Sequence, residues 1–543
     1  MNKVNDKNIS SISLIVLCLA QIGTSGDNSV LSFATSQLIQ NMNASMDQVQ
    51  TANIVYSLLA GAMMVFGGMS GIAWGFRRVF LSGAALCAVG ELMAVLAPDM
   101  EIFVWGARTI TGLGAALMIP SVLGIIVSIY QGKERVFAFG AIGSATGIAV
   151  IVMPVGAGFI MDTAGYQTAF TLMSVWFLIV FIGGVLFIPG IKPASIKIDF
   201  IGTIFTFAGL VCVIIGCSQI SVWGFITPMR APFTFMGISP AIPVIITGLI
   251  ILAITLRFES YIEKIRGSAL IPVSFTRTPA VRSGLYVTGL IFSALGVCLF
   301  MIPSWVMVVA GQSSMQSAIM ALFLAVPMIV LSLLLPKKFS WLSPRLVVMV
   351  SSGLLMAGFL ILSFSLLPGN YSISMYAGMF FCGCGMGGYS SQSAMIVAAA
   401  LNPRDAAQSG GVQCSVRNIW QAAGVAMIGA VFLSGLTANF KSQIMNSQLP
   451  ESLKTSVATR QVIELVSDNE MMSSLKSSGL SDNEISQVMD IYRDAEVRSG
   501  RYAFLASFLM VLLHIPGFRR IQTKGWSERY PGNPKVRNSG VVE

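Results

Sequence analysis

Long apolar runs separated by short polar breaks recur along the whole chain and constrain its fold more than any other feature. A helix needs about 20 mostly apolar residues to cross the hydrocarbon core of a bilayer. Only 10% of the 543 residues are charged and 55% are hydrophobic, which excludes an ordinary soluble domain. We predict an all-α polytopic membrane protein. The fourteen predicted spans are residues 11–40, 48–72, 78–97, 101–130, 136–160, 167–189, 199–221, 240–259, 283–310, 313–335, 346–367, 371–400, 407–440 and 501–516.

The distribution of basic residues predicts the orientation of these spans. Lysine and arginine are retained on the cytoplasmic side of short loops. If the N-terminus is inside, 23 of the 33 basic residues are cytoplasmic, and the short outer loops contain only Arg230. We therefore expect both termini in the cytoplasm, a location in the cell (inner) membrane and an even number of spans. The net charge of +10 is mostly an orientation signal and implies no nucleic-acid partner.

The segment from Lys441 to Arg501 is the one sizeable polar stretch between predicted spans. It contains two Ser-Asp-Asn-Glu sequences, at residues 467–470 and 481–484, which match the capping box of a helix N-terminus. Apolar residues follow Ile485 at the i+3, i+4 and i+7 positions, as in an amphipathic helix. We predict a helical outer cap, and two roles remain open: packing on the outer rim, or acting as a gate or docking site.

The sequence contains no pattern that favours an enzyme, a metal site or a cofactor. All eight cysteines fall inside apolar spans, and the spacing of Cys382 and Cys384 suits neither a zinc knuckle nor a redox pair. The one histidine, His514, has no neighbouring nucleophile or ligand cluster in the sequence. A pore would need rings of polar residues or a filter sequence. A carrier of small molecules is therefore favoured over an enzyme or a channel.

Short motifs placed in a fixed order along the chain narrow the class further. They are Gly26-Asp27-Asn-Ser-Val, Arg108-Thr-Ile-Thr-Gly112-Leu-Gly114, Ile271-Pro-Val-Ser-Phe-Thr-Arg277, Asn402-Pro-Arg-Asp405 and Arg417-Asn-Ile-Trp-Gln-Ala-Ala-Gly424. In this order and register the sequence resembles the major facilitator superfamily, and within it the fourteen-helix drug:proton antiporter branch. The likeness covers nearly the whole chain.

The resemblance implies a fold of two six-helix bundles with two inserted helices, working by alternating access. The N-terminal bundle is then residues 1–190, the inserted helices 191–265 and the C-terminal bundle 266–543, which includes the outer cap 441–500 and a cytoplasmic tail 517–543. It also implies proton-coupled efflux of small amphiphilic molecules or drugs by a monomer, with protons and lipid as the other partners.

The glycine and basic residues of the family's conformational motifs are present with departures. Ile72 and Ala73 stand where the family usually has an acid and a basic residue, which puts the inner latch in doubt. In the fifth span Pro154 and the later glycines still favour a broken hydrogen bond and close helix approach. The conformational residues are Gly68, Gly75, Arg77, Arg78, Gly112, Gly114, Pro154, Gly156 and Gly158.

Four ionisable residues inside predicted spans are candidates for the transport chemistry, because charge in lipid is costly. They are Asp27, Glu91, Arg108 and Arg417. Glu91 and Arg108 are almost equally far from the turn near Asp99, so we predict that they approach within ion-pair distance. Glu91 is then a structural partner or a proton site. Arg108 alternatively faces Asp27 as the switchable partner of a proton relay.

Asp27 is the preferred coupling residue, because it matches the acidic position of the family's first helix; the alternative is a hydrogen-bonded helix kink. Arg417 either snorkels to the inner surface or contacts the substrate path. The predicted spans of the C-terminal bundle contain no acid, which favours monocationic, zwitterionic or neutral amphiphilic cargo. An anionic metabolite or siderophore, bound through Arg108 and Arg417, is the alternative.

Overall fold

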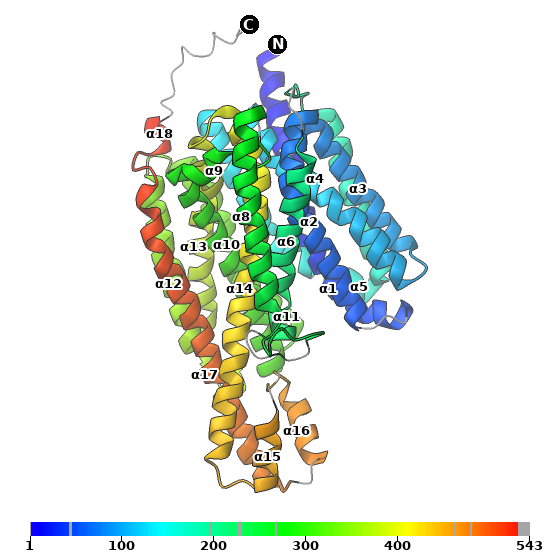
Figure 1. Cartoon of the computed structure of the whole chain (residues 1–543), viewed down its shortest axis with the longest axis vertical. Coiled ribbons are helices and arrows are strands. Elements are labelled where there is room, and N and C mark those ends of the chain that lie inside the picture. The colour runs from blue at the N-terminus through cyan, green and yellow to red at the C-terminus, as the bar shows by residue number, and fades with distance from the viewer. Residues whose placement is uncertain are drawn as a thin grey trace.

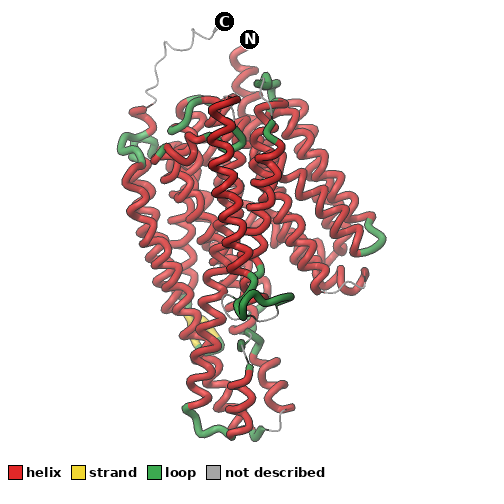
Figure 2. Tube along the Cα trace, viewed as in Figure 1, coloured by secondary structure: helices red, strands yellow, loops and turns green. Residues whose placement is uncertain are grey.

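The computed structural model describes residues 2–42, 46–194, 198–224, 228, 231–266, 269–460, 462–463, 465–477 and 480–529. In this part the chain is almost entirely helical, and most helices run along one long axis (Figure 2). The described strands are β1 (Leu366–Leu367) and β2 (Asn370–Tyr371), which form one short antiparallel hairpin. The start of α1 and the short helix α18 (Trp526–Arg529) lie at the same end of the molecule (Figure 1). We call this the termini end.

The helices of the first third of the chain pack mainly on one another. They are α1 (Asn2–Met42), α2 (Met46–Trp74), α3 (Phe76–Leu96), the π-helical segment η1 (Ile102–Arg108), α4 (Thr109–Ile129) and α5 (Gly132–Phe187). Helix α1 packs on α5, α3 packs on α4 and α5, and α2 packs on α4. Gly165 interrupts α5 with a φ of 80°, a backbone conformation that glycine adopts readily. The break explains why α5 covers two predicted spans, 136–160 and 167–189.

Next come α6 (Phe200–Ser218) and α8 (Ala241–Arg266), with the one-turn helix α7 (Ile220–Trp223) between them. The family resemblance predicts that α6 and α8 are an insertion, and we call them the inserted helices. Helix α6 packs on α8, and it also contacts α2 and α14. The pair therefore lies where helices from the two halves of the chain meet.

The second half of the chain forms another group of packed helices, with α10 on α14, α12 on α13 and α17, and α11 on α13. Its elements are α9 (Val273–Arg277), α10 (Pro279–Pro303), the π-helical segment η2 (Ser304–Val309), α11 (Ser314–Lys338), α12 (Pro344–Ser365), α13 (Ser374–Ala399), α14 (Pro403–Met445), α17 (Asp482–His514) and the 3-10 turn η3 (Ile515–Arg520).

The helical membrane fold that the apolar runs predict is confirmed. Every one of the fourteen predicted spans lies on a helix of the structure. Within the described part, 11 helices are long and apolar enough to cross a membrane, and a shorter apolar stretch lies at Ser11–Asp27. The chain is a multi-pass membrane protein, and the total of fourteen spans remains a prediction.

The predicted outer cap forms a small helical unit at the end opposite the termini end (Figure 1). It combines the ends of α14 and α17 with α15 (Glu451–Thr459) and α16 (Asp468–Ser477). Its own hydrophobic core includes Phe440, Val488 and Tyr492. The predicted capping box at Ser481 and Glu484 is present in both directions, so the local sequence signal sets where α17 begins.

The two groups of helices meet along the half of the molecule nearest the termini end, at a contact that we call the bundle seam. Gly68 of α2 lies against the backbone of Gly411 in α14, where an added Cβ would be 3.0 Å from the Gly411 nitrogen. Ser144 of α5 donates to the Ile329 carbonyl of α11 at 3.1 Å and also bonds the Ser332 hydroxyl. Toward the opposite end, α1, α3 and α5 diverge from α12 and α17 (Figure 1).

Candidate functional site

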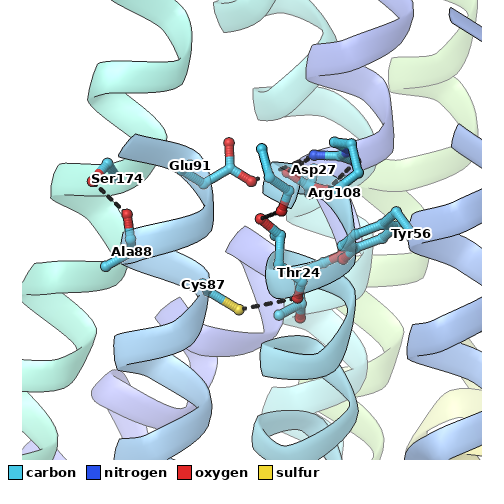
Figure 3. Close-up of polar contacts among 10 residues, drawn as sticks. Thr24, Asp27, Tyr56, Cys87, Ala88, Glu91, Arg108 and Ser174 are labelled. Carbon is cyan, nitrogen blue, oxygen red and sulfur yellow. Dashed lines mark hydrogen bonds and ion pairs between the residues drawn. The ribbon is translucent and has the colours of Figure 1, made fainter. Parts of the chain in front are cut away.

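Asp27, Glu91 and Arg108 come together in a buried cluster that we call the triad (Figure 3). The Arg108 Nη2 atom lies 2.7 Å from Asp27 Oδ2, and Nη1 lies 3.3 Å from Asp27 Oδ1. Nη1 is also 3.5 Å from Glu91 Oε1. All three side chains are 0% exposed. The predicted approach of Glu91 and Arg108 is confirmed, and Arg108 also meets Asp27.

Three different helical segments supply the triad. Asp27 lies on α1, Glu91 on α3, and Arg108 is the last residue of η1, directly before α4. A π-helical turn inside an α-helix often marks a functional site, and here the turn ends at Arg108. The apolar sequence of η1 contains no signal for this turn.

Tyr56 completes the surroundings of Arg108, and sequence reasoning did not single it out. The guanidinium carbon lies 4.6 Å from the centroid of the Tyr56 ring, which is a cation–π contact. The Tyr56 hydroxyl donates to the Thr24 carbonyl on α1 at 3.0 Å. The available signal was a single tyrosine in the apolar stretch of α2, which is weak evidence without knowledge of the helix packing.

The two carboxyl groups of the triad are held unequally. Asp27 uses both oxygens on Arg108, whereas Glu91 reaches it with one oxygen at the longer distance of 3.5 Å. The second oxygen of Glu91, Oε2, is buried without a hydrogen-bond partner. If both acids were ionised, the triad would carry one uncompensated negative charge, and a buried unpaired charge is expensive.

Arg417 lies on α14 in the other half of the chain and does not join the triad. Its guanidinium carbon is 4.9 Å from the centroid of the Phe292 ring on α10, and its Nε atom is buried without a partner. Phe292 and Arg417 are each about 20 Å along their helices from the termini end, at 1.5 Å per residue. The Arg417 side chain contacts the Phe292 ring at the same depth and does not extend toward the helix end. The geometry therefore favours packing inside the bundle over snorkelling.

The glycines of the fourth-helix motif allow close packing next to the triad. A Cβ added at Gly112 would lie 3.0 Å from the Tyr56 carbonyl oxygen, and one at Gly114 would lie 2.7 Å from the Cys87 nitrogen. Larger side chains at these two positions would therefore push α4 away from α2 and α3.

The turn between α2 and α3 keeps part of the motif that its sequence suggested. Gly75 precedes α3 with a φ of 94°, which favours glycine. Arg77 donates to the Val185 carbonyl of α5 at 2.6 Å, while Arg78 is exposed. In this region the Ile72 carbonyl accepts the N–H of Ala194 at 2.9 Å, so the segment after α5 docks on the end of α2.

The expectation for the fifth span is only partly matched. A Cβ added at Gly156 would meet no described atom within 4 Å, so this glycine makes no close contact among the described residues and its role in helix approach stays a prediction. A glycine in a helix marks close packing only where the facing helix actually arrives there. Pro154 and Gly158 lie outside the residues whose side chains the structure describes.

Sequence reasoning also missed two buried acids on the inserted helices. Asp199 is 4% exposed and Glu259 is 0% exposed. Asp199 stands at the start of α6 and Glu259 near the end of α8. Because α6 and α8 are antiparallel neighbours, the two acids lie at the same depth. The matching positions were visible in the sequence, but acids at the ends of spans are usually exposed to water.

Comparison with known proteins identifies the family. The family model of the Major Facilitator Superfamily matches residues 17–425. A probable actinorhodin transporter of Streptomyces coelicolor is 26% identical over 436 residues, which is 77% of this chain and 72% of that protein. The multidrug efflux pump LfrA of Mycolicibacterium smegmatis is 35% identical over 119 residues, 22% of this chain and 23% of that protein.

Solved structures show the same fold at low sequence identity. The human organic anion transporter MFSD10 superposes with a TM-score of 0.56 at 12% identity, covering 95% of this chain and 99% of that one. The proton:xylose symporter XylE gives a TM-score of 0.53 at 13% identity, covering 96% and 99%. Family model, relatives and helix arrangement agree, and the chain belongs to the major facilitator superfamily, whose members are membrane transporters.

Proposed function

We propose that this protein is a proton-coupled exporter of small amphiphilic molecules, with fourteen spans, both termini in the cytoplasm and a monomeric working unit. The relative named as a multidrug efflux pump supports the direction of transport. The positive-inside distribution of lysine and arginine supports the orientation in the inner membrane.

The observation that carries proton coupling is the charge imbalance of the triad. Two acids and one arginine lie in full burial, and the arginine compensates only one carboxylate. The other acid is best kept neutral by a proton. The free Oε2 of Glu91 supports Glu91 as the acid that holds this proton, with Asp27 as the ionised partner of Arg108.

The proposed cycle moves Arg108 between the two acids. A proton arriving at Asp27 neutralises it and weakens its hold on Arg108. The guanidinium then turns to Glu91, which releases its proton as it becomes the ionised partner. The triad is neutral before and after the exchange and carries one extra positive charge only until Glu91 releases its proton. One proton is taken up and one is released. Coupling to cargo requires that these two events occur with the site open to opposite sides.

Asp27→Asn tests this proposal in proteoliposomes that contain the full chain. The variant keeps the shape of the side chain and cannot bind the proton. We expect proton-driven net transport of a fluorescent amphiphilic cation or neutral dye to fall to background, while exchange of the dye without a gradient persists. Transport against a gradient at the wild-type rate would overturn the role of Asp27.

A second candidate cargo is an anionic metabolite, and one observation favours it. Among the described residues no acid is paired with Arg417, so its charge is available to a ligand carboxylate. Arg108, by contrast, is occupied by the triad. Arg417→Gln should abolish binding of a carboxylate probe and leave binding of a cationic dye intact if this candidate is right. Equal effects on both probes would exclude a charge-selective role.

A further inference from the structure

Two carboxyl groups of the inserted helices face each other near the termini end, in a site that we call the carboxyl pair. Asp199 caps α6: its Oδ1 accepts the N–H groups of Ile201 and Gly202, both at 3.1 Å. Glu259 of α8 uses Oε2 to accept the Leu270 N–H at 2.6 Å. Each acid therefore has one oxygen fixed by the backbone.

The remaining oxygens point into one shared space. Asp199 Oδ2 and Glu259 Oε1 are both buried without a hydrogen-bond partner. A Cβ added at Gly202 would lie 3.0 Å from Asp199 Oδ2 and 1.8 Å from Glu259 Oε1. The two oxygens thus approach the same point over α6, and only a glycine at position 202 leaves room for them.

Among the residues that the structure describes, no cation compensates this pair. Neither acid forms an ion pair in the part of the chain that the structure describes, and no group of three metal-binding side chains was found among those residues. The basic residues Arg257 and Lys264 of α8 are exposed. Two ionised carboxylates whose free oxygens approach the same point in a buried place would repel each other strongly.

Two further described acids, on α8 and α14, are already engaged. Glu263, one turn further along α8, accepts the Val273 N–H at 2.6 Å. Asp405, on α14, accepts the Ser274 hydroxyl at 2.7 Å. Neither of them supplies a positive charge to the pair.

We propose that Asp199 and Glu259 form a second proton-binding site, in which the two carboxyl groups share one proton between Asp199 Oδ2 and Glu259 Oε1. The site belongs to the inserted helices and uses no residue of the triad. The inference therefore does not rest on the proposed role of Asp27, and a failure of either leaves the other standing.

The shared proton also holds a contact beside the bundle seam. Leu270, whose N–H is bound by Glu259, accepts with its own carbonyl from the Gln408 amide of α14 at 2.7 Å, and the Ala269 carbonyl accepts at 3.0 Å. The backbone carbonyl oxygen of Gln408 would lie 3.2 Å from a Cβ added at Gly68. Loss of the proton would separate the carboxyl groups, pull on Leu270 and loosen this contact.

Infrared difference spectroscopy of the purified full chain, between mildly acidic and mildly alkaline pH, tests the proton directly. The wild type should show a protonated-carboxyl band that Glu259→Gln and Asp199→Asn each remove. Glu263→Gln is the matched control on the same helix and should keep the band, as should Asp27→Asn. An unchanged band in both pair variants would overturn the proposal, and so would a band that responds to sodium instead of pH.

A glycine substitution tests the geometry, and a native cysteine reports on the contact at the seam. Gly202→Ala places a methyl group between the oxygens and should abolish the band, while Gly353→Ala, which meets no atom within 4 Å, should not. Alkylation of Cys414 on α14 is read by peptide mass spectrometry and divided by its rate in the unfolded chain at the same pH, because a thiolate reacts faster than a thiol. This ratio should rise several-fold with alkaline pH in the wild type and stay constant in Glu259→Gln, whose amide can bridge to Asp199 at any pH. Should Gly202→Ala fail to fold, Glu259→Gln still decides, and a rise of the ratio that persists in this variant overturns the link to the seam.

Discussion

The triad and the carboxyl pair each contain two acidic side chains that are buried between helices, and they differ in what compensates the negative charge. In the triad, Arg108 lies 2.7 Å from Asp27 and reaches Glu91 only at 3.5 Å, and we propose that a proton neutralises the second acid. In the carboxyl pair, backbone N–H groups satisfy one oxygen of each acid and the described chain provides no cation. An arginine that can move between two acids permits exchange of partners. A pair without a cation can only hold or lose its proton, so the triad suits coupling and the pair suits control of a contact.

The largest effect that separates the two sites should come from removing the cation. Arg108→Leu leaves Asp27 and Glu91 buried and uncompensated, which should destabilise the protein by about 3–5 kcal/mol, as for one partner of a buried ion pair. Arg108→Lys retains the charge and should lose less. Thermal unfolding of the purified variants measures both. Wild-type stability of Arg108→Leu would mean that protons compensate the triad as they do the pair.

A smaller loss is expected when the tightly held acid of the triad is neutralised. Asp27→Asn removes the charge-assisted contact at 2.7 Å, for which about 1.5–3 kcal/mol is typical. Glu91 should then ionise and take over Arg108, so a protonated-carboxyl band of the triad should vanish while that of the carboxyl pair remains. Persistence of the triad band in infrared spectra would contradict the assignment of the proton to Glu91.

Neutralising the loosely held acid should hardly alter stability. Glu91→Gln mimics the protonated side chain, so we expect a change of under about 1 kcal/mol, the usual scale of one neutral hydrogen bond. Proton-driven transport should nevertheless fall to background, because Arg108 loses its alternative partner. A strong loss of stability in thermal unfolding would show that Glu91 is ionised at rest and is a structural partner only.

The smallest expected effect concerns communication between the two sites. Glu91 and Glu259 lie on different helices and share no hydrogen-bond partner. The changes in unfolding free energy of Glu91→Gln and Glu259→Gln should therefore add in the double variant to within about 0.5 kcal/mol. A larger interaction energy in the double-mutant cycle would mean that the seam couples the two proton sites.

One contact of the site and one helix boundary could be predicted from the sequence, because both depend on residues that are close together along the chain. The hairpin between the third and fourth spans places Glu91 and Arg108 at matching depth, and their approach was predicted from that alone. The capping box at Ser481 set the start of α17 for the same reason. Gly156 shows the limit, since its spacing resembled a packing motif while an added Cβ there would meet no described atom within 4 Å.

The sequence by itself determined that this chain is a helical membrane protein and placed its spans, because apolar length and charge position are local properties. Only the tertiary structure decided which charged side chains lie together. Asp27 meets Arg108 across 81 positions of the chain, and Asp199 faces Glu259 only because Gly202 lets two inserted helices approach. Burial and partnering of a charge depend on helix crossings between distant segments, and no local pattern encodes them.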